Sequence, residues 1–395
     1  MMRKIPFFAP LLLILGLLSL SACNDKDKTT ATSDAAAKTQ QTYQWKMVTT
    51  WPPNFPVFQE GVDRFAKMVE TMSQGRLKIQ VFAGGELVPA MESFDAVSQG
   101  SVQMGHGAAY YWAGKVPAAQ FMSAVPFGMN GKGMDAWFYG GEGKGLSLWR
   151  ELYKPFDLRP FPMGNSGVQM GGWFNKKITQ VEDLKGLKMR IPGLGGKVLA
   201  KAGGSPVLLA GSELYTALER GVLDATEWVG PFHDQRLGLD RAAKYYYTPG
   251  WHEPGTTLEL IVNQQAWDSL PADLQAIVDA ASIASNQWMS SQFEVLNLQA
   301  LRELEAKPHV EILTFPPAVL AKLKAMTAEV LMEEAAKNPE FKRIYEAYSA
   351  FQKDNDAWSL ISEVAYYHAG HPDESGNIAN NVQKTLQQNL KKNTE

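Results

Sequence analysis

Hydrophobic positions alternate or recur at helical spacing through most of the chain, and the two spacings follow one another in a regular order. Residues 43–49 and 77–81 alternate as strands do, whereas 58–72 repeats its apolar positions every three or four residues, as one face of a helix does. A short helix over 91–99 and a strand over 102–105 complete a β-α-β-α-β order. This order predicts a parallel sheet with crossover helices.

The second half of the chain repeats this organisation. Strands are predicted over 168–175 and 187–191, and a helix over 212–220 ends at Gly221, before a short strand that leads to Thr226. The first half contains a similar succession of helix end, glycine and strand, although this order is common in α/β proteins. Two such α/β lobes, facing each other, would enclose a cleft.

The remaining apolar segments predict elements that join the two lobes. Residues 256–263 predict a strong strand, which is a candidate hinge that crosses back to the first lobe. A long helical pattern follows over 271–306, then a strand over 310–314 and two further helices over 317–337 and 339–368. The whole pattern predicts an α/β protein with two lobes.

The first residues of the chain have the features of a bacterial secretion signal. Arg3 and Lys4 supply positive charge, 5–20 is an uncharged and mostly apolar run, and small residues directly precede Cys23. The apolar run is short for a bilayer span, which needs roughly 20 residues. Because the sequence LSAC that ends at Cys23 resembles a lipobox, we expect 1–22 to be a signal peptide and Cys23 to be lipidated. A cleaved signal with an incidental cysteine, or an uncleaved anchor, is the alternative.

Composition separates the body of the chain from its two ends. Residues 23–42 are polar and lack aromatic side chains, which predicts a flexible tether, and 372–395 is rich in Asn, Gln and Lys, which predicts a disordered tail. The body between them is too long for a single hydrophobic core, so two domains are expected.

Cys23 is the only cysteine, which excludes an intrachain disulfide. The formal net charge is -3, and no basic run of the kind that binds nucleic acid occurs.

Several motifs in the body of the chain coincide with those of one protein family. The motifs are WKMVTTWP at 45–52, KMRIPG at 188–193, SELYTALERG at 212–221, DATEWVGP at 224–231 and YTPGWHEPG at 247–255. They resemble the periplasmic solute-binding subunits of TRAP (tripartite ATP-independent periplasmic) transporters, and the resemblance covers nearly the whole chain after Tyr43. The Glu227-Trp228 pair and the motif at 247–255 resemble the branch that binds 2-oxo acids or lactate.

The resemblance implies an architecture, a location and a partner. It implies a two-lobed periplasmic binding protein with mixed sheets, hinge strands and a long spanning helix. Lobe I would begin with 43–164 and lobe II would be 165–255. Residues 256–371 would supply the hinge strand, the spanning helix, the return to lobe I and the C-terminal helices. A separate membrane permease, driven by an ion gradient, would take the ligand. With the lipobox, the expected location is the periplasm, with a lipid anchor at Cys23.

Arg190, in the KMRIPG motif, is the first candidate for a ligand contact. A guanidinium can hold a carboxylate with two parallel hydrogen bonds, which fixes orientation as well as charge. A surface arginine with a solvated partner is the alternative. The resemblance implies a small 2-oxo or 2-hydroxy monocarboxylate as the ligand. A different organic acid, such as a dicarboxylate, a sugar acid or an aromatic acid, is the alternative ligand.

Gln169, Glu227, Trp228 and Glu253 form the second candidate set. The resemblance implies that these positions hold a metal ion between protein and ligand, and that Gln169 and Trp228 also contact the ligand. Oxygen ligands suit a hard cation such as sodium or calcium. Ordinary salt bridges of the two glutamates, and a core position for Trp228, are the alternatives.

Two neighbouring tyrosines are candidates on the other lobe. Tyr110 and Tyr111 follow the predicted strand over 102–105, at the end where α/β sheets place ligands. Alternation would put one of them in the site and the other in the core, and we choose Tyr110 for the ligand contact. Trp51 and Phe55 lie in the corresponding loop after the first strand and are expected to wall the pocket.

Two other classes of protein compete with this interpretation. An enzyme is disfavoured because the histidines are scattered without an HxxxH pair, and because the chain has no GxSxG elbow and no P-loop. A structural lipoprotein would use partner contacts, and the predicted helix over 339–368 has more aromatic residues than a solvated helix needs. A homodimer through the C-terminal helices and packing against the chain's own body remain the two alternatives for this helix.

Overall fold

The computed structural model describes residues 41–371. The signal peptide expected over 1–22, the lipidation of Cys23, nearly all of the tether and the tail over 372–395 lie outside the described residues. Among the described helices, none combines the length and the apolar character that a membrane crossing requires.

Five strands form the first sheet: β1 (Tyr43–Thr49), β2 (Leu77–Phe82), β3 (Met104–Gly107), β4 (Leu158–Asn165) and β10 (Thr257–Asn263). Their order is β2-β1-β3-β10-β4. The predicted parallel pairing of β1 with β2 and β3 is present, and β10 is antiparallel to both of its neighbours. The sequence pattern does not predict β4, because Pro160 and Pro162 interrupt it. An edge strand tolerates prolines, which donate no ladder hydrogen bond.

Helices cover this first sheet and connect its strands. Helix α1 (Phe58–Met72) begins and ends where its apolar spacing predicts, and it buries Val62, Phe65 and Val69 among others. The shorter crossover α2 (Ser93–Ser98) precedes β3. A 3₁₀ turn, η2 (Ala109–Trp112), follows β3. Three more helices lie near this sheet: α3 (Gly131–Tyr139), α4 (Lys144–Tyr153) and α9 (Gln264–Ser269).

Six strands form the second sheet: β5 (Gly172–Phe174), β6 (Lys188–Arg190), β7 (Ser205–Val207), β8 (Ala225–Thr226), β9 (Tyr245–Thr248) and β11 (Glu311–Thr314). Their order is β11-β9-β5-β8-β6-β7, with parallel and antiparallel pairs. Strand β5 is shorter than the strand predicted over 168–175. The backbone N–H groups of Gln169 and Met170 bond to loop carbonyls of Glu253 and Val229, so this segment leaves the ladder.

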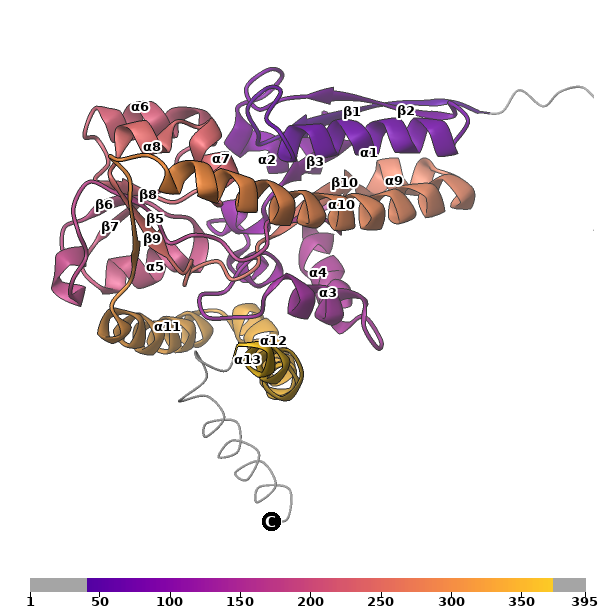
Figure 1. The fold of residues 1–395 in the computed structure, drawn as a ribbon. Coiled ribbons are helices and arrows are strands. Elements are labelled where there is room, and N and C mark those ends of the chain that lie inside the picture. The colour runs from indigo at the N-terminus through magenta and orange to yellow at the C-terminus, as the bar shows by residue number, and fades with distance from the viewer. Residues whose placement is uncertain (1–40, 372–395) are drawn as a thin grey trace, which may run out of the picture. The chain divides into compact units, whose positions relative to one another are not determined.

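Short helices accompany the second sheet: α5 (Gly193–Lys201), α6 (Leu214–Glu219), α7 (Pro231–Arg236) and α8 (Leu239–Ala242). The long helix α10 (Ala272–Glu305) packs against β4 and α1 of the first sheet and against α7 of the second. Figure 1 shows it running from the side of α1 and β10 to the side of α7. Two mixed sheets with covering helices and a spanning helix make the two-lobed α/β fold that the sequence predicts.

The C-terminal helices also contact both lobes. Helix α11 (Pro317–Lys337) packs on α5, and α12 (Pro339–Ser359) packs on the 3₁₀ turn η3 (Pro117–Met122). The single helix predicted over 339–368 continues through a π-helical turn into α13 (Ala365–Gly370).

Candidate functional site

Strand pairing in the second sheet brings the two central charged residues together. Strands β6 and β8 are parallel neighbours, with Arg190 opposite Thr226. Arg190 ends β6, and Glu227 directly follows β8, so both side chains emerge at the carboxyl edge of the sheet. The backbone N–H of Glu227 donates to the carbonyl of Arg190 at 3.2 Å, which fixes this register.

The Arg190 guanidinium is buried and engaged by the protein. Its Nη1 donates to the carboxylate of Glu227, Nε donates to the carbonyl of Leu209 at 3.3 Å, and Nη2 donates to the hydroxyl of Tyr111 at 3.4 Å. The guanidinium also lies over the Trp228 ring, 5.1 Å from its centroid. Burial is the strongest single influence on the pKa of Arg190 and lowers it, but Glu227, Tyr111, Tyr110 and Glu253 together outweigh burial and raise that pKa. Arg190 therefore stays charged inside the protein.

Glu227 uses only one of its two oxygens. Oε1 accepts from Arg190, whereas Oε2 has no hydrogen-bond partner among the described residues. Nε2 of His252 lies 3.4 Å from Oε2, in a geometry that is not a hydrogen bond. Both side chains are fully buried. An unpaired carboxylate oxygen beside an unpaired imidazole is unfavourable in a dry interior unless another group completes it.

Glu253 brings a second carboxylate to the same place. Its Oε2 accepts from the hydroxyl of Tyr110 at 3.3 Å and from the hydroxyl of Thr256. Burial, and then the charge of Glu227, raise the pKa of Glu253 to about 7. Glu227, His252 and Glu253 each offer one ligand atom, and these atoms lie within 4.8 Å of one another.

Gln169 joins this cluster from the loop that connects β4 to β5. Its Nε2 donates to the hydroxyls of Ser166 at 2.9 Å and Thr256 at 3.1 Å, and the same Thr256 hydroxyl donates to Glu253. Its Oε1 is buried and has no partner among the described residues. The amide is therefore oriented with its donor side held by the protein and its acceptor oxygen free.

Both tyrosines of η2 reach site residues from the other lobe. The Tyr110 hydroxyl contacts Glu253 and the Tyr111 hydroxyl contacts Arg190. The prediction that alternation sends one of them into the core is wrong, because they lie in a 3₁₀ turn and not in a strand. Of the two, Tyr110 is more buried, at 7% exposed.

Aromatic rings enclose the remaining side of the site. Trp228 lies edge-on to Trp51 at 6.4 Å and to Phe55 at 6.2 Å, measured between ring centroids. Trp51 and Phe55, which are expected to wall the pocket, thus lie against Trp228, and the indole N–H of Trp228 has no partner among the described residues.

The structure brings together all the described residues that the sequence predicts for the site. His252, Tyr111 and Thr256 are additional members that the sequence reasoning did not assign. His252 stands beside Glu253 in the YTPGWHEPG motif, which was the available signal, but a single histidine in a loop does not indicate which carboxylate it will meet.

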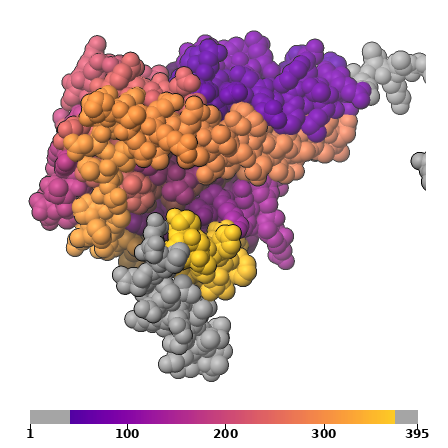
Figure 2. Space-filling view, viewed as in Figure 1, coloured from indigo at the N-terminus to yellow at the C-terminus, as the bar shows by residue number. Residues whose placement is uncertain are grey.

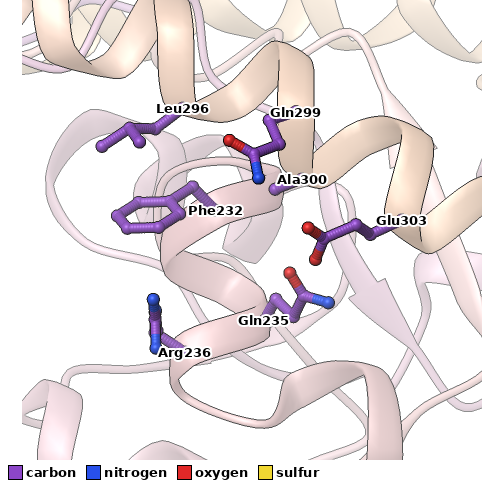
Figure 3. Close-up of a pocket in the computed structure, with 7 residues that line it drawn as sticks. All are labelled: Phe232, Gln235, Arg236, Leu296, Gln299, Ala300 and Glu303. Carbon is purple, nitrogen blue, oxygen red and sulfur yellow. The ribbon is translucent and has the colours of Figure 1, made fainter.

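Two hollows in the described part of the molecule are lined by none of the site's charged residues. One, of about 290 Å³, is lined by Tyr110, Tyr111, Pro192 and Leu208 among others. The other, of about 420 Å³, lies between α7 and α10. Figure 3 shows that Phe232, Gln235 and Glu303 line this second hollow and that no predicted site residue does.

Comparisons with known proteins agree with this fold and site. Residues 47–338 match the family described as bacterial extracellular solute-binding protein, family 7. The monocarboxylate 2-oxoacid-binding periplasmic protein of Nostoc sp. is 44% identical over 323 residues, which are 82% of this chain and 88% of that protein.

The chain also matches two proteins of known crystal structure over nearly the whole length of each. A TRAP periplasmic solute-binding protein from Pseudoalteromonas atlantica, with bound sodium and pyruvate, is 46% identical, with a TM-score of 0.81 over 83% of this chain and 99% of that chain. A TRAP solute-binding protein from Bordetella bronchiseptica is 37% identical, with a TM-score of 0.82 over 85% of this chain and 99% of that chain. The latter is a mixed-occupancy dimer with copurified calcium and picolinate in its active site.

Two α/β lobes around a buried charged site define a binding protein for a small charged solute. The chain belongs to the bacterial extracellular solute-binding proteins of family 7, the solute-binding subunits of TRAP transporters. The family resemblance inferred from the sequence motifs is confirmed.

Proposed function

We propose that this protein captures a small 2-oxo or 2-hydroxy monocarboxylate together with a sodium or calcium ion and delivers it to a TRAP membrane permease. The observation that carries the proposal is the buried set of Arg190, Glu227, Glu253 and Gln169, in which two oxygens lack partners within the described part of the chain, beside a buried positive charge. The pyruvate and sodium in the Pseudoalteromonas atlantica structure, and the 2-oxoacid in the name of the Nostoc protein, support it.

The oxygen atoms of this set fit a hard cation. Gln169 Oε1 and Glu227 Oε2 are buried and have no partner among residues 41–371, and Glu253 holds a second carboxylate close to Glu227. Oxygen donors of this kind suit sodium or calcium. A bound cation would supply positive charge next to two carboxylates and an anionic ligand. Gln169, Glu227, Glu253 and the main chain at Trp228 are the proposed cation ligands.

Arg190 and its neighbours are the proposed contacts of the ligand carboxylate. Because Nη1 is occupied by Glu227, the ligand would approach Nη2, whose one hydrogen bond within residues 41–371 is the 3.4 Å bond to the Tyr111 hydroxyl. The two parallel hydrogen bonds expected from the sequence would then require Nη1 to donate to both Glu227 and the ligand carboxylate. Gln169, Trp228 and Tyr110 would complete the ligand contacts.

The oxygen on C2 of the acid distinguishes this proposal from the alternatives. A carboxylate and an adjacent oxygen can both reach one cation, so pyruvate should bind with at least tenfold higher affinity than propionate, which lacks that oxygen. Calorimetric titration of the mature protein with each acid, with and without sodium and calcium, measures this. Equal affinity for the two acids, or tight binding of a dicarboxylate, sugar acid or aromatic acid alone, would contradict the proposal. Chemically unchanged ligand after incubation would support binding without turnover.

The proposed organisation around this site follows the predicted boundaries. Lobe I (43–164) and lobe II (165–255) would close on the ligand, with the hinge strand, spanning helix and C-terminal helices supplied by 256–371. The proposed location is the periplasm, with 1–22 removed and Cys23 lipidated. The lipobox supports the anchor, since acylation of such a cysteine supplies more than one chain. Cys23→Ser should move the protein from the membrane to the soluble fraction.

We also propose a homodimer through the C-terminal helices. Tyr348 packs against the chain's own Phe121 and Trp137, so the first half of α12 belongs to the core. Beyond it, Trp358 is 61% exposed and Tyr366 is 83% exposed. This segment, yellow in Figure 2, lies at the surface. Large exposed aromatic side chains on one segment are typical of an interaction surface.

A further inference from the structure

The ligand site is closed in this conformation. Arg190, Glu227 and Glu253 are all at most 3% exposed. A ligand cannot reach these groups unless the two lobes separate, so any contact between the lobes contributes to the balance between open and closed forms.

One such contact involves a strained turn in the first lobe. Val57, between β1 and α1, has φ 62° and ψ -55°, and the N–H of Phe58 donates to the carbonyl of Pro56 at 2.7 Å. These values define a γ-turn with positive φ, which is rare and unfavourable, especially for a β-branched residue. Val57 is fully buried, and its N–H donates to Glu60 at 3.3 Å. Strain of this kind persists only where surrounding contacts hold it.

One contact that holds the turn comes from the second lobe. Nε2 of His233, on α7, lies 2.7 Å from the carbonyl oxygen of Pro56, which already accepts from Phe58. A carbonyl can only accept, so His233 carries its proton on Nε2. Burial lowers the pKa of His233 to about 3, and the ring is therefore neutral.

The surroundings of His233 are aromatic and dry. Its ring centroid lies 4.5 Å from Phe55, 4.6 Å from Phe58 and 4.8 Å from Phe293. Phe55 and Phe58 also contact the Trp228 ring, at 6.2 Å and 6.3 Å. The hydrogen bond to Pro56 thus lies directly behind the wall of the ligand site.

We propose that the turn at Pro56–Phe58 and His233 form a latch that is complete only when the lobes close on the ligand. The strain at Val57 opposes closure, and the His233 hydrogen bond and its aromatic surroundings offset it. His233 is then a positioning residue: it touches no ligand but sets the affinity by holding Phe55 against Trp228. This inference rests on the proposed ligand capture between the lobes.

Substitutions on the two sides of the latch should change affinity in opposite directions. His233→Phe fills the aromatic cage but removes the donor, and should weaken pyruvate binding about tenfold. His233→Gln retains a donor and should recover part of the loss. Val57→Gly relieves the strain, because glycine adopts positive φ readily, and should bind at least fivefold more tightly than Val57→Ala. Alanine retains the strained Cβ and loses the same methyl groups, which makes it the matched control.

Calorimetric titration with pyruvate at saturating sodium or calcium measures these affinities, after thermal unfolding has verified that each variant is folded. Equal affinities for Val57→Gly and Val57→Ala, or an unchanged affinity for His233→Phe, would overturn the latch. If the unmodified protein bound no carboxylate, the proposed function would fail separately. Small-angle X-ray scattering of the ligand-free variants would then decide the latch: Val57→Gly should be more compact than Val57→Ala, and indistinguishable curves would refute it.

Discussion

Replacing Arg190 with methionine tests the site at its most deeply buried positive charge. The Arg190 side chain is 1% exposed and its partner Glu227 is 0% exposed, so both charges have left water. Removing one partner leaves the other buried and uncompensated, which typically costs about 3–5 kcal/mol. Arg190→Met should therefore lower the free energy of unfolding by an amount in this range.

The same substitution should weaken pyruvate binding by at least about a hundredfold, or about 2.7 kcal/mol. Without the guanidinium, the ligand carboxylate would meet Glu227 and Glu253 with no arginine to offset them. At about 5 Å and an effective dielectric constant near 20, each like-charged pair repels by roughly 3 kcal/mol. Arg190→Lys should recover only part of the affinity, because an ammonium group cannot contact Glu227, Tyr111 and the ligand in one plane.

Calorimetric titration with pyruvate and denaturant unfolding would separate the two effects. Arg159→Met is a suitable control, because Arg159 is also partly buried and stacks on Trp267 at 4.7 Å, yet contacts none of the site residues. It should lose some stability and keep its affinity. An Arg190→Met protein that binds pyruvate within about threefold of the unmodified protein would refute the assignment of Arg190 to the ligand carboxylate.

Three further predictions concern other parts of the molecule. Burial raises the pKa of Glu259 from its ordinary 4.5 to about 7, so the folded protein holds this proton where the unfolded chain releases it, and stability should fall as pH rises from about 4.5 to about 7. The shift corresponds to roughly 3 kcal/mol, and Glu259→Gln should remove that part of the pH dependence in unfolding titrations; an unchanged slope would contradict it. Gln169→Ala should weaken both calcium and pyruvate binding at least tenfold in calorimetry, and normal calcium affinity would mean that Gln169 is only structural. Trp358→Ala combined with Tyr366→Ala should convert a dimer to a monomer in light scattering, without a change in pyruvate affinity.

Local pattern was sufficient for much of the fold. The apolar spacing of α1 and the alternation of β1 depend on which side chains one face must bury, so they can be read along the chain. Strand β4 could not be predicted from the sequence, because Pro160 and Pro162 break its alternating pattern. Only the position of β4 at the edge of the sheet makes these prolines acceptable. The start of β5 was also misjudged, since backbone partners in distant loops draw Gln169 and Met170 out of the ladder.

For the site too, the sequence indicated some features and only the tertiary structure decided others. Sequence motifs pointed to Arg190, Glu227, Glu253 and Gln169, because each stands in a recognisable motif or beside a strand end. Only the tertiary structure decided which of them meet: the parallel register of β6 and β8 pairs Arg190 with Glu227.

Contacts between distant segments could not be read from the sequence at all. The placement of both η2 tyrosines in the site, the approach of His252 to Glu227 and the bond from His233 to Pro56 join residues up to 177 positions apart. Such contacts depend on how the two lobes pack together. The periodicity of a single helix or strand records which face is buried, but it does not record what that face will be buried against.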